Sequence, residues 1–348
     1  MSNFDNIKGK YPLLIEGLCN AAKSHRLAHA FIIQGAMAES RNKFALALAQ
    51  IGCCPNRAEN GEPCQVCNIC RAIDNDNYAD MTKLTPEGKA FQIKVGDVGN
   101  PLPNTLRNFT DSFYFSKISS AERKVGIIYE ADRMNSEAQN ALLKTLEEPP
   151  RESLIILATA KPKSLLPTTV SRCHLITLTD KKLNFTFAKQ KELFSALFSA
   201  FNADGDLLQL EESAETIIGI AESLKAEAND KIEAEFMPKI EQAKEFDDKL
   251  VKRLTQLMSD NAVGCYIGER MQFLSAIYCF FAQLALLAEG ADFDNLPNSE
   301  VFDSLEVKKS EIPLEKALNA VKLAESMIYS FNFFVNEPLA IRSFIFNI

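Results

Sequence analysis

The sequence predicts an α/β domain built on a parallel β-sheet, followed by a region made of helices alone. Up to about residue 180, short apolar runs alternate with helical segments, which is typical of strands covered by helices on both faces of a parallel sheet. After that point the hydrophobic spacing is helical almost throughout. The 348 residues, 47% of them hydrophobic, suffice for two or three domains with ordinary cores.

The first part of the chain supplies the strands and the helices that cover them. Strands are expected at residues 29–34, 125–129, 153–159 and 174–178. A turn signal at residues 85–88 separates two further short strand candidates. Helices are expected at residues 5–28, 40–53 and 136–148. The last of these begins with a capping box at Ser136 and stops before Pro149.

The second part is expected to hold long helices. They cover residues 206–258, which carry acidic faces, the far more apolar residues 265–288, and residues 313–348. We therefore expect three regions in the chain. They are an α/β domain at residues 1–179, a helical region at residues 180–250, and an all-helical domain at residues 251–348.

The charge is unevenly distributed along the chain. There are 46 acidic and 38 basic residues, a net charge of −8, and residues 201–250 alone carry −9. An acidic chain with a nearly neutral remainder does not fit a free-standing, non-specific DNA-binding protein. The start of the chain lacks a secretion signal, and no apolar run approaches the roughly 18 residues that a membrane span needs. We therefore expect a cytoplasmic protein that does not span a membrane.

Four cysteines in a polar loop have the spacing C-x9-C-x2-C-x2-C: Cys54, Cys64, Cys67 and Cys70. Short spacings of this kind let tight turns bring thiolates to one point, and four thiolates form a closed site for a structural zinc ion. Cytoplasmic cysteines stay reduced, which favours metal binding over disulfides. We therefore expect structural zinc in a module at residues 53–71. Spacing alone leaves Cys53 open as an alternative to Cys54.

A degenerate phosphate-binding loop follows the first expected strand. A nucleotide-binding chain would have G-x4-G-K-[ST] between this strand and the next helix. Gly35 begins the loop, but Ser40, Arg41 and Asn42 replace the second glycine, the lysine and the hydroxyl residue. The replacements remove the glycine that lets backbone amides wrap a phosphate, the lysine that contacts it, and the hydroxyl that holds Mg²⁺.

The strand at residues 125–129 shows a matching loss. A hydrolytic site ends this strand with Asp-Glu, and the aspartate holds Mg²⁺. Tyr129 replaces the aspartate here, while Glu130 remains. Because both Mg²⁺-holding positions are lost together, we expect a nucleotide-type fold that does not hydrolyse ATP and has no functional nucleotide cofactor of its own.

Three further motifs resemble the clamp-loader ATPase-type subunits of bacterial DNA polymerase III. Residues 140–150 look like the signature helix of that family, residues 157–159 look like its sensor strand, which ends at Thr159, and Ser171-Arg172-Cys173 looks like its Ser-Arg-Cys motif. The four cysteines lie where the family has its zinc module, just after the phosphate-loop helix, and this position favours Cys54 as the fourth ligand. The resemblance covers about residues 5–178.

The resemblance implies an AAA+ fold and a place in a ring of five subunits with the gamma or tau motor subunits and the delta subunit. With degenerate nucleotide motifs, the chain is most similar to the catalytically silent members, the delta-prime subunits. The resemblance further implies that Ser171, Arg172 and Cys173 face the ATP site of the neighbouring motor subunit, where Arg172 acts as an arginine finger. The sliding clamp and primed DNA are then reached through the complex. Residues 328–348 resemble the collar helices that hold such rings together.

Two other functions compete with this interpretation. An ATPase-active motor subunit of the gamma or tau type, with a divergent phosphate loop, would bind and hydrolyse MgATP. A zinc-containing DNA-binding repair protein would need a basic stripe, which the N-terminal region lacks.

Residues 180–250 lack the glycine-containing pattern of the family's lid domain, so a reduced or diverged lid is expected there.

Overall fold

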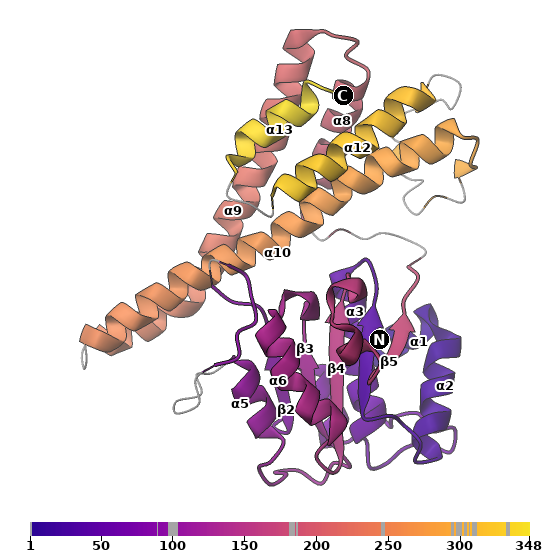
Figure 1. Cartoon of the computed structure of the whole chain (residues 1–348), viewed down its shortest axis with the longest axis vertical. Helices are drawn as coiled ribbons and strands as arrows, with labels where there is room; N and C mark the ends of the chain where they lie inside the picture. Colours follow the sequence, from indigo (N-terminus) through magenta and orange to yellow (C-terminus); the bar gives the residue numbers. More distant parts are fainter. Residues whose placement is uncertain are drawn as a thin grey trace. The chain divides into compact units, whose positions relative to one another are not determined.

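The structure, a computed structural model, consists of two compact units, Met1–Asp180 and Lys181–Ile348 (Figure 1). The first unit combines a sheet with helices, and the second is helical. The structure describes all residues except 1, 89, 97–103, 181–184, 186, 245–247, 294–295, 297–300, 303–304, 306, 308–311 and 332–334.

The first unit is built on a parallel sheet of five strands in the order β2-β3-β4-β1-β5. The strands are β1 (Ala30–Gln34), β2 (Met81–Leu84), β3 (Lys124–Ile128), β4 (Ser153–Thr159) and β5 (His174–Thr177). The predicted parallel sheet is therefore confirmed. Because β4 lies between β1 and β3, the carboxyl ends of these three strands meet at one edge of the sheet.

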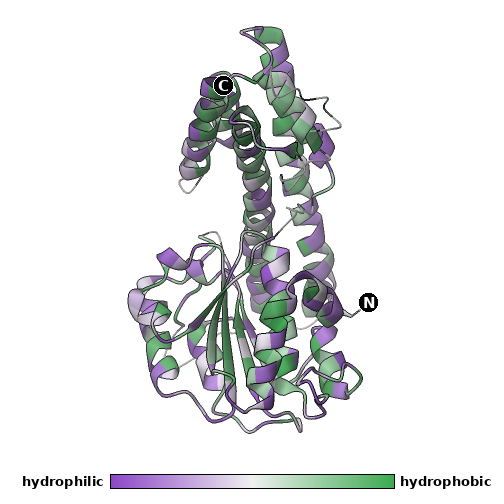
Figure 2. Cartoon of the chain, turned by 90° about the vertical axis from the view of Figure 1, so that its right-hand side faces the viewer, coloured by the Kyte–Doolittle hydropathy of each residue, from purple (hydrophilic) through white to green (hydrophobic). Residues whose placement is uncertain are grey.

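Helices cover both faces of this sheet. One layer contains α1 (Asn3–Lys10), α2 (Pro12–Lys23), α3 (Ala38–Cys53) and α4 (Asn68–Asp74), and the other contains α5 (Leu106–Ser112), α6 (Ser136–Glu147) and α7 (Pro167–Val170). Successive side chains of a strand point to opposite faces, so Phe31 and Ile33 join the first core while Ala30 and Ile32 join the second. Figure 2 shows the hydrophobic strands between the two layers.

One predicted helix and one predicted helix cap in this unit are wrong. The single helix expected at residues 5–28 is two helices, because Pro12 lacks the N–H that would continue α1 and instead begins α2. The cap of α6 is Asn135 rather than Ser136. The Asn135 side chain accepts a hydrogen bond at 2.8 Å from a backbone N–H in the first turn, which places Ser136 inside the helix.

The second unit contains the long helices that the sequence predicted. They are α8 (Gln190–Phe201), α9 (Leu207–Lys244), α10 (Asp248–Ala288), α12 (Leu314–Ser330) and α13 (Glu337–Ile345). The apolar helix expected at residues 265–288 is only the second half of α10, which runs without interruption from Asp248. The expected boundary at residue 250 lies just inside α10, and the division of this unit stays a prediction.

Aromatic packing and ion pairs hold the second unit together. The Phe280 ring of α10 stacks on Phe194 of α8 with ring centres 5.7 Å apart. Arg342 of α13 pairs with Glu211 of α9 at 3.1 Å. Part of the acidic stretch is therefore used inside this unit, where it helps fix the C-terminal helix.

The helix α10 is long and apolar enough to cross a membrane by length and composition, and it is the one such helix among the described residues. Of its most apolar 18-residue window, 56% is buried inside the structure. Phe273, Ile277 and Phe281 are among the buried side chains. A helix buried to this extent is a core helix. Apolar core helices also meet the length and composition criteria for a membrane span.

Candidate metal site and degenerate nucleotide site

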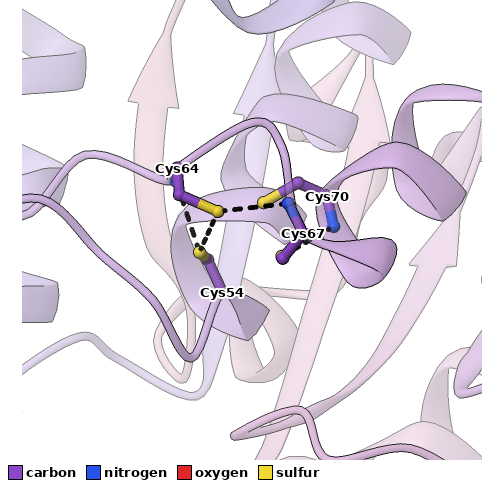
Figure 3. Close-up of side chains that lie close together, drawn as sticks. All are labelled: Cys54, Cys64, Cys67 and Cys70. Carbon is purple, nitrogen blue, oxygen red and sulfur yellow. Dashed lines mark hydrogen bonds between the residues drawn. The ribbon is translucent and has the colours of Figure 1, made fainter.

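The structure brings the four predicted cysteines together (Figure 3). The sulfur atoms of Cys54, Cys64, Cys67 and Cys70 all lie within 4.8 Å of one another, and those of Cys54 and Cys64 are 3.6 Å apart. A tetrahedral zinc ion with Zn–S bonds of about 2.3 Å needs sulfurs about 3.8 Å apart. The number, type and spacing of these donors therefore fit a structural zinc ion.

Backbone N–H groups prepare these sulfurs for a metal. The N–H of Cys64 donates to the Cys54 sulfur at 3.3 Å, and the N–H of Cys67 donates to the Cys64 sulfur at 3.3 Å. The N–H of Cys70 donates to the Cys67 sulfur at 3.4 Å, where Cys67 caps α4. Such bonds favour the thiolate, which is the form that binds metal. The loop also needs Gly61, whose φ of +83° and approach to the Cys19 carbonyl exclude a larger residue.

The structure separates Cys53 from this cluster. Cys53 is the last residue of α3, is fully buried, and its thiol donates to the Arg123 carbonyl oxygen at 3.3 Å. Burial raises the pKa of Cys53 to about 12, whereas a hydrogen bond with the Cys70 thiol lowers the pKa of Cys54. Of the two residues that spacing left open, the structure thus brings the sulfur of Cys54 into the cluster, whereas that of Cys53 bonds elsewhere.

The residues predicted to form a degenerate nucleotide site lie together at one edge of the sheet. In open α/β sheets, ligands bind at the carboxyl ends of the strands, where the order of the strands reverses. Gly35 follows β1, Glu130 lies two residues after β3, and Thr159 ends β4. Since these strands are neighbours, the three positions predicted from separate motifs share this edge.

Arg41 fills the phosphate-loop position with its own side chain. The residue is 2% exposed, and its guanidinium donates to the carbonyl oxygens of Gly35 at 2.7 Å and Ala36 at 3.1 Å. The same guanidinium forms an ion pair with Glu130. The loop therefore directs carbonyl oxygens at a buried cation, whereas a phosphate-binding loop directs amide N–H groups at an anion.

The end of β3 is arranged around this ion pair. Glu130 has a left-handed backbone, with φ at 46°, and its side chain reaches Arg41. Burial raises the pKa of Glu130, an effect that the Arg41 charge opposes. Burial also raises the pKa of Tyr129, which therefore stays a neutral phenol. Tyr129 has no carboxylate for Mg²⁺, and one oxygen of the Glu130 carboxylate is taken by Arg41.

Ser40 and Asn42 have separate surroundings. The Ser40 hydroxyl donates to Asp180 at 2.9 Å and accepts from Lys10 at 2.8 Å, and Lys10 pairs with Asp180 at 2.5 Å. The Asn42 side-chain oxygen is buried without a hydrogen-bond partner in the described part of the chain. Sequence reasoning missed Lys10 and Asp180, because no motif connects residues so far apart in the chain.

The sensor-type residue Thr159 contacts neither Arg41 nor Glu130 by any described hydrogen bond. Its hydroxyl donates to Asp132 at 2.6 Å and accepts from the N–H of Lys161 at 2.9 Å. Asp132 belongs to a short 3-10 helix, Ala131–Arg133, directly after Glu130. Thr159 thus ties the end of β4 to the segment that follows β3.

The Ser-Arg-Cys segment follows α7, and its three side chains have different surroundings. The Ser171 hydroxyl donates to the Thr168 carbonyl at 3.1 Å and so closes the end of α7. Cys173 packs against the second core, and burial raises its pKa to about 12. The Arg172 side chain is 34% exposed, donates to the Thr168 carbonyl at 2.9 Å, and pairs with Glu147 of α6 at 2.6 Å. Arg172 alone therefore presents a charged group to solvent.

Comparison with known proteins identifies the family. A sequence profile for the family described as "DNA polymerase III, delta subunit" matches residues 11–182, which is nearly all of the first unit. This first unit is therefore a domain of the clamp-loader family of DNA polymerase III subunits. The family resemblance carried by the sequence motifs is confirmed.

Individual clamp-loader proteins match different lengths of the chain. DNA polymerase III subunit delta' of Bacillus subtilis is 32% identical over 166 residues, covering 47% of this chain and 46% of that protein. Subunit tau of Bacillus subtilis is 28% identical over 331 residues, covering 94% of this chain and 49% of that protein. A DNA polymerase III gamma subunit-related protein of Thermotoga maritima covers 95% of this chain and is itself covered to 97%, with 19% identity and a TM-score of 0.41. The chain spans about half the length of the curated clamp-loader relatives it matches.

Proposed function

We propose that this chain is a non-hydrolysing subunit of the DNA polymerase III clamp loader that gives Arg172 to the ATP site of a neighbouring motor subunit. The observation that carries the proposal is the buried pair of Arg41 and Glu130 at the edge where nucleotide phosphates would bind. A cation already bonded to two loop carbonyls and a carboxylate leaves no N–H cradle for phosphate, and Tyr129 supplies no ligand for Mg²⁺.

The role of Arg172 follows from its chemistry and its place. A guanidinium is always charged and can bond two oxygens of a γ-phosphate at once, so it stabilises the charge that develops during phosphoryl transfer. Arg172 is the charged member of its motif and is partly exposed, while Ser171 closes α7 and Cys173 packs against the second core on either side of it. In this proposal, the Arg172 side chain projects from the surface of this subunit into the ATP site of the neighbouring subunit.

We also propose that Cys54, Cys64, Cys67 and Cys70 hold a structural zinc ion. Four protein thiolates close the coordination sphere, so the ion would fold the loop between α3 and α4 and would have no catalytic position. The metal is therefore assigned to the stability of the module rather than to ATP chemistry.

Metal analysis of the purified chain should find about one zinc ion per chain. Replacing Cys64 and Cys67 with serine together should abolish that zinc, because a site with two remaining thiolates binds it far more weakly. Cys53→Ala is the matched control and should keep the zinc, since the Cys53 thiol bonds the Arg123 carbonyl instead. A native protein free of metal would contradict the proposal.

The partners follow from the same proposal. Motor subunits of the gamma or tau type and a delta subunit would complete a ring of five, with the helical unit, and residues 328–348 in particular, serving as its collar. The sliding clamp and primed DNA would be bound by the complex in the cytoplasm. The acidic stretch at residues 201–250 agrees with a subunit that leaves most phosphate contacts to its partners.

The second candidate is an ATPase-active motor subunit, and the tau match over 331 residues favours it. The two functions differ in what the isolated chain does with MgATP. A silent subunit should neither bind it tightly nor turn it over, whereas a motor subunit should do both. Titration of the isolated chain with MgATP is therefore the experiment that tests the proposed function.

A further inference from the structure

Three contacts hold the Arg172 guanidinium in a fixed direction. Its Nη1 donates to the Thr168 carbonyl at 2.9 Å and to the Ser171 hydroxyl at 3.5 Å, and its Nη2 pairs with Glu147 at 2.6 Å. A guanidinium has five N–H donors. At least two of them are without a partner among the described residues and are free to bond an oxyanion. The Arg172 side chain is thus held in one direction and still has N–H donors for an oxyanion.

The helix that carries Glu147 is itself well anchored. Glu147 is the last residue of α6, a helix that buries Leu142 and Leu146 in the second core. The side chain of Gln139, two turns earlier in α6, accepts a hydrogen bond at 2.7 Å from the N–H of Leu166, the residue before α7. α6 therefore contacts the segment that carries Arg172 through Gln139 as well as Glu147, and among the described contacts only that of Glu147 reaches the arginine itself.

From this geometry we infer that Glu147 is a positioning residue for Arg172 and orients its guanidinium before the neighbouring subunit binds. The inference rests on the proposed function, because it concerns the same arginine finger. An unrestrained arginine has many rotamers, and fixing one of them in advance lowers the entropic cost of reaching a phosphate. Glu147 lies outside the Ser-Arg-Cys motif and would act only through Arg172.

Because the Glu147–Arg172 pair is partly exposed, an effect on the orientation of Arg172 can be measured apart from an effect on folding. The Glu147 side chain is 50% exposed and that of Arg172 is 34% exposed, so their ion pair adds little to the stability of the fold. Loss of Glu147 should therefore leave the chain folded and able to assemble. Its effect should appear in the turnover of the neighbouring ATPase, where Arg172 would be used.

The test measures the DNA-stimulated ATPase of the complex reconstituted with motor and delta subunits, using Glu147→Gln in the full chain. We expect kcat to fall about two- to fivefold, the size of one exposed ion pair, with KM for ATP and the thermal midpoint of the chain unchanged. Glu148→Gln is the matched control, because Glu148 is the next residue in the chain, is exposed, and has no described contact with Arg172. It should leave kcat unchanged.

A second pair of variants isolates the path through Arg172. Adding Glu147→Gln to Arg172→Ala should have no further effect on kcat, because a positioning residue has nothing left to orient. An unchanged or raised kcat for Glu147→Gln alone, or an additive loss in the double variant, would overturn the inference. If Arg172→Ala alone leaves kcat unchanged, the arginine finger itself is wrong. A loss with Arg172→Ala but none with Glu147→Gln refutes only the positioning role.

Discussion

Arg172→Ala should lower the DNA-stimulated ATPase turnover of the reconstituted complex by about tenfold or more, because arginine fingers are worth up to several powers of ten in other phosphoryl-transfer enzymes. The side chain lies at the surface, and its ion pair with Glu147 contributes little to folding. The isolated variant should therefore have the thermal midpoint of the unaltered chain. Steady-state phosphate release by the assembled complex is the measurement.

Two controls sharpen this result. Arg172→Lys keeps the charge but loses the planar fork, so it should recover only a small part of the turnover. Arg26→Ala removes another exposed arginine of the same unit and should leave turnover unchanged. Equal turnover for the complexes containing Arg172 and Arg172→Ala would remove the finger role from this chain.

Arg41→Ala should destabilise the first unit by about 3–5 kcal/mol, because removing one partner of a buried ion pair leaves the other charge buried and unpaired. Arg41 bridges the loop after β1 and Glu130 after β3, so both strand ends lose their connection. Hydrogen exchange of the β1 and β3 amides in the full chain measures the free energy of opening of this region.

The pH dependence of the stability of the Arg41→Ala variant shows whether the unpaired Glu130 charge causes the loss. Burial already raises the pKa of Glu130, and removing the Arg41 charge should raise it further. A group whose pKa is raised in the folded state costs least stability below its unfolded pKa, and the cost grows as pH rises toward the folded pKa. The loss should therefore be smaller at acidic pH than at neutral pH.

Charge removal and shape change are separated by two further variants. Lys43→Ala, on the same helix, breaks only an exposed pair with Glu39 and should change the stability by less than about 0.5 kcal/mol. Replacing Arg41 with methionine and Glu130 with glutamine together removes both charges at similar volume and should recover much of the loss. A loss from Arg41→Ala no larger than that from Lys43→Ala would contradict a structural ion pair.

Local patterns predicted the parts of the molecule that depend on neighbouring residues in the sequence. The apolar run at residues 153–159 is β4, and the closely spaced cysteines meet because tight turns connect them. The break at Pro12 could also have been predicted, because proline cannot continue a helix. The hydrophobic spacing continues on both sides of Pro12, so the stretch was predicted as a single helix. The correct predictions and the error at Pro12 all concern residues that lie close together in the sequence.

The contacts that define the degenerate nucleotide site could not be predicted in this way. Arg41 and Glu130 are 89 residues apart, and Ser40 and Asp180 are 140 residues apart. Their pairing depends on the order of the strands, which places the ends of β1, β3 and β4 side by side. The motifs predicted that ordinary phosphate and Mg²⁺ ligands are missing, but only the fold shows that Arg41 bonds the loop carbonyls and pairs with Glu130.

The central claim, a nucleotide-type fold that does not use nucleotide, is tested most directly by MgATP itself. The isolated full chain is titrated with MgATP in a calorimeter, and phosphate release is followed in the same preparation, with an isolated motor subunit of the gamma or tau type as the positive control. The Arg41 and Glu130 pair predicts no saturable binding at micromolar ATP and no phosphate release above background. Tight binding accompanied by turnover would contradict the account and would identify an active motor subunit.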